Sequence, residues 1–299
     1  MIDSIHALKT KKHAVILAHI YQRPEIQDIA DFVGDSLDLS RKAASTEAEI
    51  IVFCGVDFMA ETAKILSPKK KVLMPDREAT CPMANMITLD ALRAKKTEFP
   101  NAAVVCYVNT KADIKAESDI CCTSRNAAIV VQSLEASQII FVPDYCLGEY
   151  VALQCPDKEF IFWPGFCPTH HRIFGEHIRA LQHAHPNARV AAHPECTRDV
   201  RDLADFVGST GAIQEYAAQA SEQEFIIATE TGILHSLQKE NPKKIFYHPT
   251  DQGVCPNMKK NTLENVLHVL ETEANEVIVP ETIADRARVA MERMLAVRS

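Results

Sequence analysis

The chain contains one short motif three times, at an almost constant interval. Cys81, Cys167 and Cys255 are each followed by proline, and these cysteines are 86 and 88 residues apart. Each motif follows a short apolar run, which is typical of a strand buried in a parallel sheet. Three thiolates on loops that leave equivalent strands can share one metal centre, and proline after a cysteine ligand also occurs in iron–sulfur motifs. This spacing therefore predicts three like structural units that converge on one site.

Each round between these motifs contains three apolar, strand-like runs separated by helical patterns, and this order repeats three times. Residues 14–18, 104–109 and 189–195 begin the three rounds, and 204–209 repeats 30–35 with five identical residues at a shift of 174. Strands that alternate with helices imply parallel sheets with right-handed crossovers. We predict an α/β fold of three pseudo-symmetric three-layer αβα repeats with parallel sheets around a central cavity. The alternative is a row of ordinary α/β domains whose similarities arise by chance.

The repeat period also predicts where the units begin and end. We expect the first αβα repeat at 1–87, the second at 88–174 and the third at 175–260, with C-terminal helices in 261–299 that pack on the outside. In parallel sheets, binding sites form beyond the carboxyl ends of the strands. The most conspicuous polar residues of each unit, together with its cysteine, follow strands in this way.

Charge and composition exclude several classes of function. The net charge of −8 gives no electrostatic support for binding nucleic acid. No apolar run approaches the roughly 20 residues that span a bilayer, and the N-terminal residues lack the pattern of a signal peptide. We therefore expect a cytoplasmic protein with no membrane or nucleic-acid partner. In that compartment ten cysteines are not a disulfide framework, so most are expected to be buried apolar residues and a few to be ligands.

A series of short motifs, in order along nearly the whole chain, resembles the quinolinate synthase family. These motifs are His19-Ile20-Tyr21-Gln22, Gly34-Asp35-Ser36, Thr80-Cys81-Pro82-Met83, Tyr107-Val108-Asn109, His193-Pro194-Glu195-Cys196, Gly208-Ser209-Thr210-Gly211 and Met258-Lys259-Lys260-Asn261. The resemblance implies a 4Fe–4S cluster on Cys81, Cys167 and Cys255, with the fourth iron left open. It also implies the condensation of iminoaspartate with dihydroxyacetone phosphate to quinolinate, phosphate and water in NAD biosynthesis. A second enzyme would supply the iminoaspartate.

The resemblance further assigns roles to residues at the strand ends. Tyr21, His193 and Glu195 are the acid–base candidates, because the reaction needs imine–enamine and keto–enol proton transfers. The candidates for binding substrate carboxylates or phosphate are His19, Ser36, Tyr107, Asn109, Ser124, Ser209 and Thr210. Ser36, Ser124 and Thr210 occupy equivalent places before helical patterns, where we expect them to be N-caps of helices that point at one cavity.

Several residues have a purely structural alternative. His19 and His193 could be core histidines, and Asp57 and Glu61 could only favour a helix dipole. Cys155 precedes proline but follows a helical pattern, so we expect it to be a small core residue. His170 and His171 follow the second cysteine loop, where one of them could line the entrance. Two departures from the family pattern also matter.

The first departure is Ile20, which stands where asparagine or an aromatic residue is expected and is predicted to form a wall. The second is the presence of Pro249 and Gln252 at positions where some family members carry a redox-sensitive cysteine pair, so no such switch is expected near Cys255. Other functions remain open from the residues alone. They are a different hydro-lyase with an open cluster, a non-catalytic iron–sulfur sensor or carrier, and a zinc enzyme with three cysteines.

Overall fold

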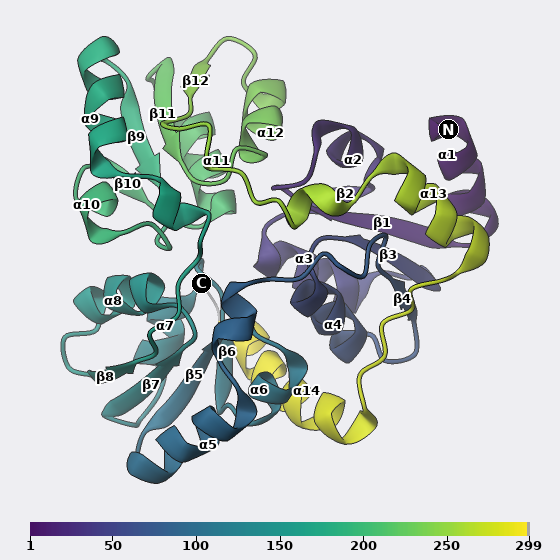
Figure 1. Ribbon diagram of the computed structural model, residues 1–299, viewed down its shortest axis with the longest axis horizontal. Helices are drawn as coiled ribbons and strands as arrows, with labels where there is room; N and C mark the ends of the chain where they lie inside the picture. The colour runs from purple at the N-terminus through teal and green to yellow at the C-terminus, as the bar shows by residue number, and fades with distance from the viewer. Residues whose placement is uncertain (298–299) are drawn as a thin grey trace.

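The computed structural model describes residues 1–297, which form three four-stranded parallel sheets flanked by helices (Figure 1). Each sheet comes from its own stretch of chain, and the three lobes surround a common centre. The strand order is the same in each: β2-β1-β3-β4, β6-β5-β7-β8 and β10-β9-β11-β12. Parallel neighbours need crossover connections, which the intervening helices provide. The predicted α/β fold of three repeated units is confirmed.

The three units share one sequence of elements. The first contains α1 (Ile2–Lys11), β1 (Ala14–His19), α2 (Pro24–Ile29), β2 (Phe32–Gly34), α3 (Ser36–Ser45), β3 (Ile50–Cys54), α4 (Asp57–Leu66) and β4 (Lys71–Leu73). The second contains α5 (Leu89–Glu98), β5 (Ala103–Tyr107), α6 (Ala112–Ala116), β6 (Ile120–Cys122), α7 (Ala127–Gln132), β7 (Gln138–Val142), α8 (Tyr145–Gln154) and β8 (Glu159–Phe162). The third contains α9 (Gly175–Ala184), β9 (Arg189–Ala192), α10 (Arg198–Arg201), β10 (Phe206–Val207), α11 (Thr210–Gln219), β11 (Glu224–Ala228), α12 (Ile233–Glu240) and β12 (Ile245–Tyr247).

Each sheet has one strand more than the three that the apolar runs predict. The additional edge strands β2, β6 and β10 are only two or three residues long, too short to show a periodic pattern. An aspartate just before each of them holds it in place. Asp31, Asp119 and Asp205 accept the backbone N–H of Ile16, Val104 and Val190 at 2.8, 2.7 and 2.8 Å. Each short edge strand is thus held against its longer neighbour by an aspartate side chain as well as by the backbone hydrogen bonds of the sheet.

The central strands are buried on both faces, as their continuous apolar runs predict. In β1, Val15 and Leu17 belong to one hydrophobic cluster, while Ile16 and Ala18 belong to another. Successive side chains of a strand point to opposite faces, so the two clusters are the two helix-covered faces of the first sheet. This arrangement leaves only the strand ends free to present polar groups.

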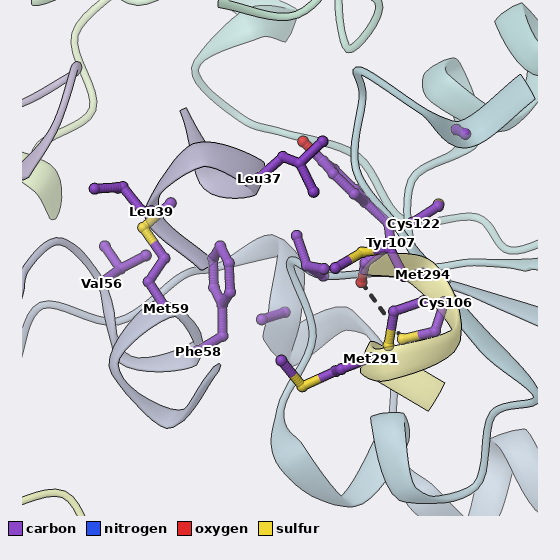
Figure 2. Close-up of a cluster of buried hydrophobic side chains, with 14 of the residues drawn as sticks. Leu37, Leu39, Val56, Phe58, Met59, Cys106, Tyr107, Cys122, Met291 and Met294 are labelled. Atoms are coloured by element: carbon purple, nitrogen blue, oxygen red, sulfur yellow. Dashed lines mark hydrogen bonds between the residues drawn. The ribbon is translucent and has the colours of Figure 1, made fainter. Parts of the chain in front are cut away.

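The C-terminal helices close the chain over the first two units. α13 (Leu263–Thr272) packs on α1, and α14 (Glu281–Ala296) packs on α6, β6 and α4. Figure 2 shows Met291 and Met294 of α14 beside Cys106, with Phe58 of the first unit in the same cluster. The unit boundaries at 87, 174 and 260 stay a prediction. Across residues 1–297, every helix is too short or too polar to cross a membrane.

Candidate active site

A cavity of about 970 Å³, open solvent at its mouth included, lies where the carboxyl ends of the three sheets converge. It is lined by all the predicted site residues except Ser209: His19, Tyr21, Ser36, Cys81, Tyr107, Asn109, Ser124, Cys167, His193, Glu195, Thr210 and Cys255. They come from all three units. The first strand of each unit supplies two of them, placed two residues apart at its end: His19 and Tyr21 after β1, Tyr107 and Asn109 after β5, and His193 and Glu195 after β9.

The two strand-end histidines are held in the same tautomer. The backbone N–H of Tyr21 donates to Nδ1 of His19, and that of Glu195 donates to Nδ1 of His193, both at 3.2 Å. Nδ1 therefore accepts, so the proton of each neutral ring is on Nε2. Nε2 of His193 lies 3.2 Å from the Ser124 hydroxyl. Burial lowers the pKa of His19 to about 4 and that of His193 to about 3. At neutral pH both rings are uncharged N–H donors.

A continuous chain of polar contacts crosses the floor of the site and joins the two tyrosines. The Tyr107 hydroxyl donates to Oε1 of Glu195 at 2.5 Å. Oε2 of Glu195 lies 2.9 Å from Nδ1 of His170, close enough for an ion pair although outside the angles of a regular hydrogen bond. Nε2 of His170 lies 2.9 Å from the Thr229 hydroxyl, which lies 2.5 Å from the Tyr21 hydroxyl. All five residues are buried, so the chain is shielded from bulk water.

The ionisation states along this chain differ between its members. Burial raises the pKa of Tyr21 and of Tyr107 well above the usual value, and the charge of Glu195 adds to the effect, so both phenols stay protonated. Burial alone would also raise the pKa of Glu195. The charge and contact of His170, with help from His193 and Tyr107, outweigh it and hold the Glu195 pKa below its ordinary value. The chain thus has a carboxylate in the middle and phenol proton donors at both ends.

The three predicted ligand cysteines form another wall of the same cavity. Cys81, Cys167 and Cys255 are partly exposed, whereas the other seven cysteines are buried. Burial raises the pKa values of all three thiols, and the charge of the other ligand cysteines adds to the effect for Cys81 and Cys167. Each sulfur also accepts a backbone N–H from the residue three positions on, in the short helical turn after the Cys-Pro pair. These donors are Ala84, His170 and Met258.

One of these cysteines also belongs to a smaller group of mixed donors. A sulfur, a ring nitrogen and a carboxylate oxygen of Cys167, His170 and Glu195 all lie within 4.8 Å of one another. Thiolate, imidazole and carboxylate are together a suitable donor set for a zinc ion. The site therefore contains a possible metal-binding group in addition to the three thiols.

The predicted helix caps were wrong in their positions. The N-caps of α3 and α11 are Asp35 and Ser209, each one residue earlier than predicted. Ser36 and Thr210 are the first helical residues, and Ser124 lies three residues before α7 begins. Asp35, rather than Ser36, caps α3 because its Oδ1 accepts the backbone N–H groups of Leu37 and Asp38, both at 3.0 Å.

Ser209 is accordingly engaged away from the cavity. Its hydroxyl accepts the N–H of Ala212 and donates to Oδ2 of Asp35, which ties the third unit to the first. Ser36, Ser124 and Thr210 line the cavity although none of them is a cap.

From the sequence, the role of His170 stayed open, Thr229 was missed, and Lys259 was found only as part of a family motif without a role. Thr229 follows directly after β11, so the rule that polar residues after parallel strands form sites could have found it. Lys259 lies 2.9 Å from Oε1 of Glu230 and donates to the carbonyl oxygen of Tyr21. It thereby joins the third cysteine loop to the loop that carries Tyr21. That contact between units leaves no local pattern in the sequence.

The fold and the site together define an α/β enzyme of three like units, with one shared cavity that carries thiols on one wall and acid–base groups on another. A family model described as "Quinolinate synthetase A protein" matches residues 3–296. The chain is 55% identical over 302 residues to the quinolinate synthase of Sulfurihydrogenibium sp. (strain YO3AOP1), covering 99% of this chain and 98% of that protein. It is 53% identical to that of Alkaliphilus metalliredigens (strain QYMF), covering 100% and 98%, and 51% identical to that of Aquifex aeolicus (strain VF5), covering 97% and 92%. The chain belongs to the quinolinate synthase family, so the predicted resemblance is confirmed.

Proposed function

We propose that the chain condenses iminoaspartate with dihydroxyacetone phosphate to give quinolinate, phosphate and two waters, in the cytoplasmic pathway to NAD. The observation that carries the proposal is the meeting of three loop thiols and a buried acid–base chain in one cavity. A condensation that loses phosphate and two waters needs several proton transfers, and such an arrangement supplies them without bulk solvent. Iminoaspartate would come from a separate enzyme.

The acid–base work falls to the buried chain between the tyrosines. Tyr21 lines the cavity and its phenol is protonated, so it can donate a proton to a departing or developing oxygen. Thr229 and His170 connect it to Glu195, which can take up the proton removed from a carbon beside an imine or carbonyl. Tyr107 donates to Glu195 and keeps one carboxylate oxygen in a fixed position. The proton lost at one end of the substrate can in this way be returned at the other.

Substrate anions are held by neutral donors. The Nε2–H groups of His19 and His193, the side chains of Asn109 and Ser124, and the N-terminal turns of α3 and α11 at Ser36 and Thr210 all line the cavity. The N-terminus of a helix offers free N–H groups and the positive end of the dipole. Carboxylates and phosphate can be bound here by a protein whose net charge is −8.

Cys81, Cys167 and Cys255 are proposed to hold a 4Fe–4S cluster. The donor set fits, because three partly exposed thiols line one cavity and each receives a backbone N–H donor that would stabilise a ligated thiolate. When bound, the cluster would present one iron without a protein ligand, a Lewis acid toward a substrate hydroxyl or carboxylate. Ligand atoms of Glu195 and His170 lie within 4.8 Å of the Cys167 sulfur, so these two residues could move protons next to a cluster held there.

Anaerobic purification, iron and sulfide analysis and an assay for quinolinate test this proposal together. We expect about four irons per chain, as a 4Fe–4S centre requires, and quinolinate from the two substrates. A chain with iron and sulfide that forms no quinolinate would leave a sensor or a different hydro-lyase and would overturn the proposed reaction.

The mixed donor group of Cys167, His170 and Glu195 supports a second candidate, a single zinc ion. The two candidates compete for Cys167, so metal analysis separates them. One zinc per chain, retained in Cys81→Ala and Cys255→Ala but lost in His170→Ala, would establish the second candidate.

A further inference from the structure

In the first and third units, the backbone of the loop that carries the ligand cysteine is held by a carboxylate of the same unit. Oδ1 of Asp57 accepts the N–H of Cys81 at 3.1 Å. Oε1 of Glu230 accepts the N–H of Cys255 at 2.9 Å. Asp57 is the first residue of α4, just after β3, and Glu230 lies between β11 and α12, so the two acceptors stand 24 and 25 residues before their cysteines. The two contacts are therefore equivalent under the threefold repeat.

The second unit places Asp144 at the corresponding position. It is the N-cap of α8, and the N–H of Cys167 acts on its carboxyl as a hydrogen-bond donor that lowers the Asp144 pKa, although burial raises that pKa overall. Among residues 1–297, its Oδ2 has no hydrogen-bond partner, and no hydrogen bond of regular geometry joins Asp144 to Cys167. Asp57, Asp144 and Glu230 are 87 and 86 residues apart, the same period as the cysteines.

Each carboxylate is itself fixed, so it can act as an anchor. Oδ1 of Asp57 also accepts the N–H of Phe58 at 2.9 Å, and Oδ1 of Asp144 accepts that of Leu147 at 2.6 Å. Glu230 is fully buried, and its Oε2 accepts the N–H of Gly232 at 2.6 Å. Each anchor thus joins the start of a helix to the cysteine loop beside it.

Electrostatics alone gives no reason for acids at these places. A negative charge beside a cysteine disfavours the thiolate, which is the form that binds a metal. Only Glu230 has a cation at ion-pair distance within residues 1–297, with Lys259 at 2.9 Å. Asp57 and Glu230 share the hydrogen bond to the cysteine backbone, and Asp144 stands at the equivalent position of the second unit. This contact fixes the direction in which the following Cβ–Sγ bond leaves the loop.

We propose that Asp57, Asp144 and Glu230 are positioning residues that orient the three cysteine loops, so that the thiols converge before a cluster is built. The inference rests on the proposed iron–sulfur cofactor. Its sequence signature is one acid per unit, 23 to 25 residues before the Cys-Pro pair. Groups that orient metal ligands in this way typically change metal affinity by about 10–100-fold when they are lost.

The test compares retention of the cluster in anaerobically reconstituted full-length protein. Asp57→Ala and Glu230→Ala remove the acceptor, while Asp57→Asn and Glu230→Gln keep an acceptor oxygen without the charge. Asp199→Ala is the matched control, because Asp199 also accepts a backbone N–H from a separate loop, that of Gly175 at 2.9 Å, away from the cysteines. The readouts are iron and sulfide per chain, the rate of absorbance loss after addition of an iron chelator, and the midpoint potential of the cluster.

We expect the alanine variants to release iron about 10–100-fold faster than the wild type, and the amide variants to lie in between. The amide variants should also shift the midpoint potential upward, because a negative charge near the cluster is gone. Asp199→Ala should match the wild type in all three readouts. The amide variants keep the test decisive if an alanine variant does not fold.

The inference is overturned if the alanine variants release iron at the rate of Asp199→Ala, or if the amide variants release it as fast as the alanine variants, which would assign the effect to charge. A wild-type chain that binds no iron is a different result. It would overturn the proposed cofactor, and this inference with it.

Discussion

Replacing Thr229 by valine breaks the buried chain between Tyr21 and His170 at its centre. The Thr229 hydroxyl lies 2.5 Å from the hydroxyl of Tyr21 and 2.9 Å from Nε2 of His170. Within residues 1–297 these two groups have no other hydrogen-bond partner. The valine side chain has the same shape as that of threonine but can neither donate nor accept a hydrogen bond. Thr229 is fully buried and does not line the cavity, so the space available to the substrate stays the same.

The size of the effect follows from these contacts. Leaving a buried polar group without its partner costs about 1–3 kcal/mol. The loss of partners for Tyr21 and His170 should therefore lower the free energy of unfolding by roughly 2–6 kcal/mol. A positioned acid or base contributes about 10²–10⁴-fold to a rate, so kcat for quinolinate formation should fall by a factor in that range. KM should change much less, because the contacts with the substrate are retained.

Steady-state assays on anaerobically reconstituted protein, well below the unfolding midpoint of the variant, measure both quantities. Iron and sulfide per chain must equal those of the wild type, so that the change in kcat is assigned to proton transfer. Thr229→Ser is the control, because it keeps the hydroxyl and should retain most of the rate. A near-normal kcat in Thr229→Val with an intact cluster would remove the chain from Tyr21 to Glu195 from the mechanism.

Three other perturbations test separate parts of the site. Cys255→Ala should abolish the iron–sulfur cluster, while Cys155→Ala should leave it intact, because Cys155 is buried outside the cavity. Iron and sulfide analysis measures the result, and a normal, active cluster in Cys255→Ala would contradict the ligand assignment. Burial lowers the pKa of His19 to about 4, whereas the usual pKa of histidine is 6.5. Below pH 6.5 the unfolded chain therefore binds a proton at His19 more readily than the folded chain does. The free energy of unfolding of the metal-free protein should fall by up to about 3 kcal/mol between pH 6.5 and 4. Denaturant titrations should show a flatter pH dependence for His19→Gln, and an unchanged slope would refute the assignment. Ser36→Ala should weaken the binding of phosphate and dicarboxylates with little loss of stability, because Ser36 lines the cavity and is not a cap. Ser209→Ala should lower the free energy of unfolding by about 1 kcal/mol, because it removes the N-cap of α11. Calorimetry measures the affinities and thermal unfolding the stability; unchanged affinities in Ser36→Ala would contradict the anion site.

The sequence predicts the features that depend on neighbouring residues. Parallel strands buried on both faces are continuous apolar runs, and the polar residues of the site follow them directly, so His19, Tyr107 and His193 could be placed at equivalent strand ends. The edge strands could not be found, because two or three residues show no period. The caps were misplaced by one residue because Asp35 and Ser36 are adjacent and both types cap helices well.

Contacts between residues of different units could not be predicted from the sequence. Tyr21, His170 and Thr229 belong to three different units, and only the packing of those units brings them within hydrogen-bond distance. A repeat period predicts that equivalent residues occupy equivalent places, but it does not say which non-equivalent residues meet across the centre. The acids before the cysteine loops are different, because their regular spacing can be read from the sequence once the structure has identified two of them by their contacts.

The distribution of like and unlike residues among the units explains how a threefold scaffold can run a reaction with no threefold symmetry. Each unit supplies the same cysteine, the same backbone donor to it and an acid at the equivalent position before its loop. At the second strand-end position the units differ, with Tyr21, Asn109 and Glu195 in the three equivalent places. In the proposed mechanism this phenol, amide and carboxylate would act as a proton donor, a neutral ligand and a base around the same cavity. If the shared residues fix the geometry and the unlike ones divide the chemistry, Glu195→Asn should keep the iron and sulfide content of the wild type and lose the formation of quinolinate.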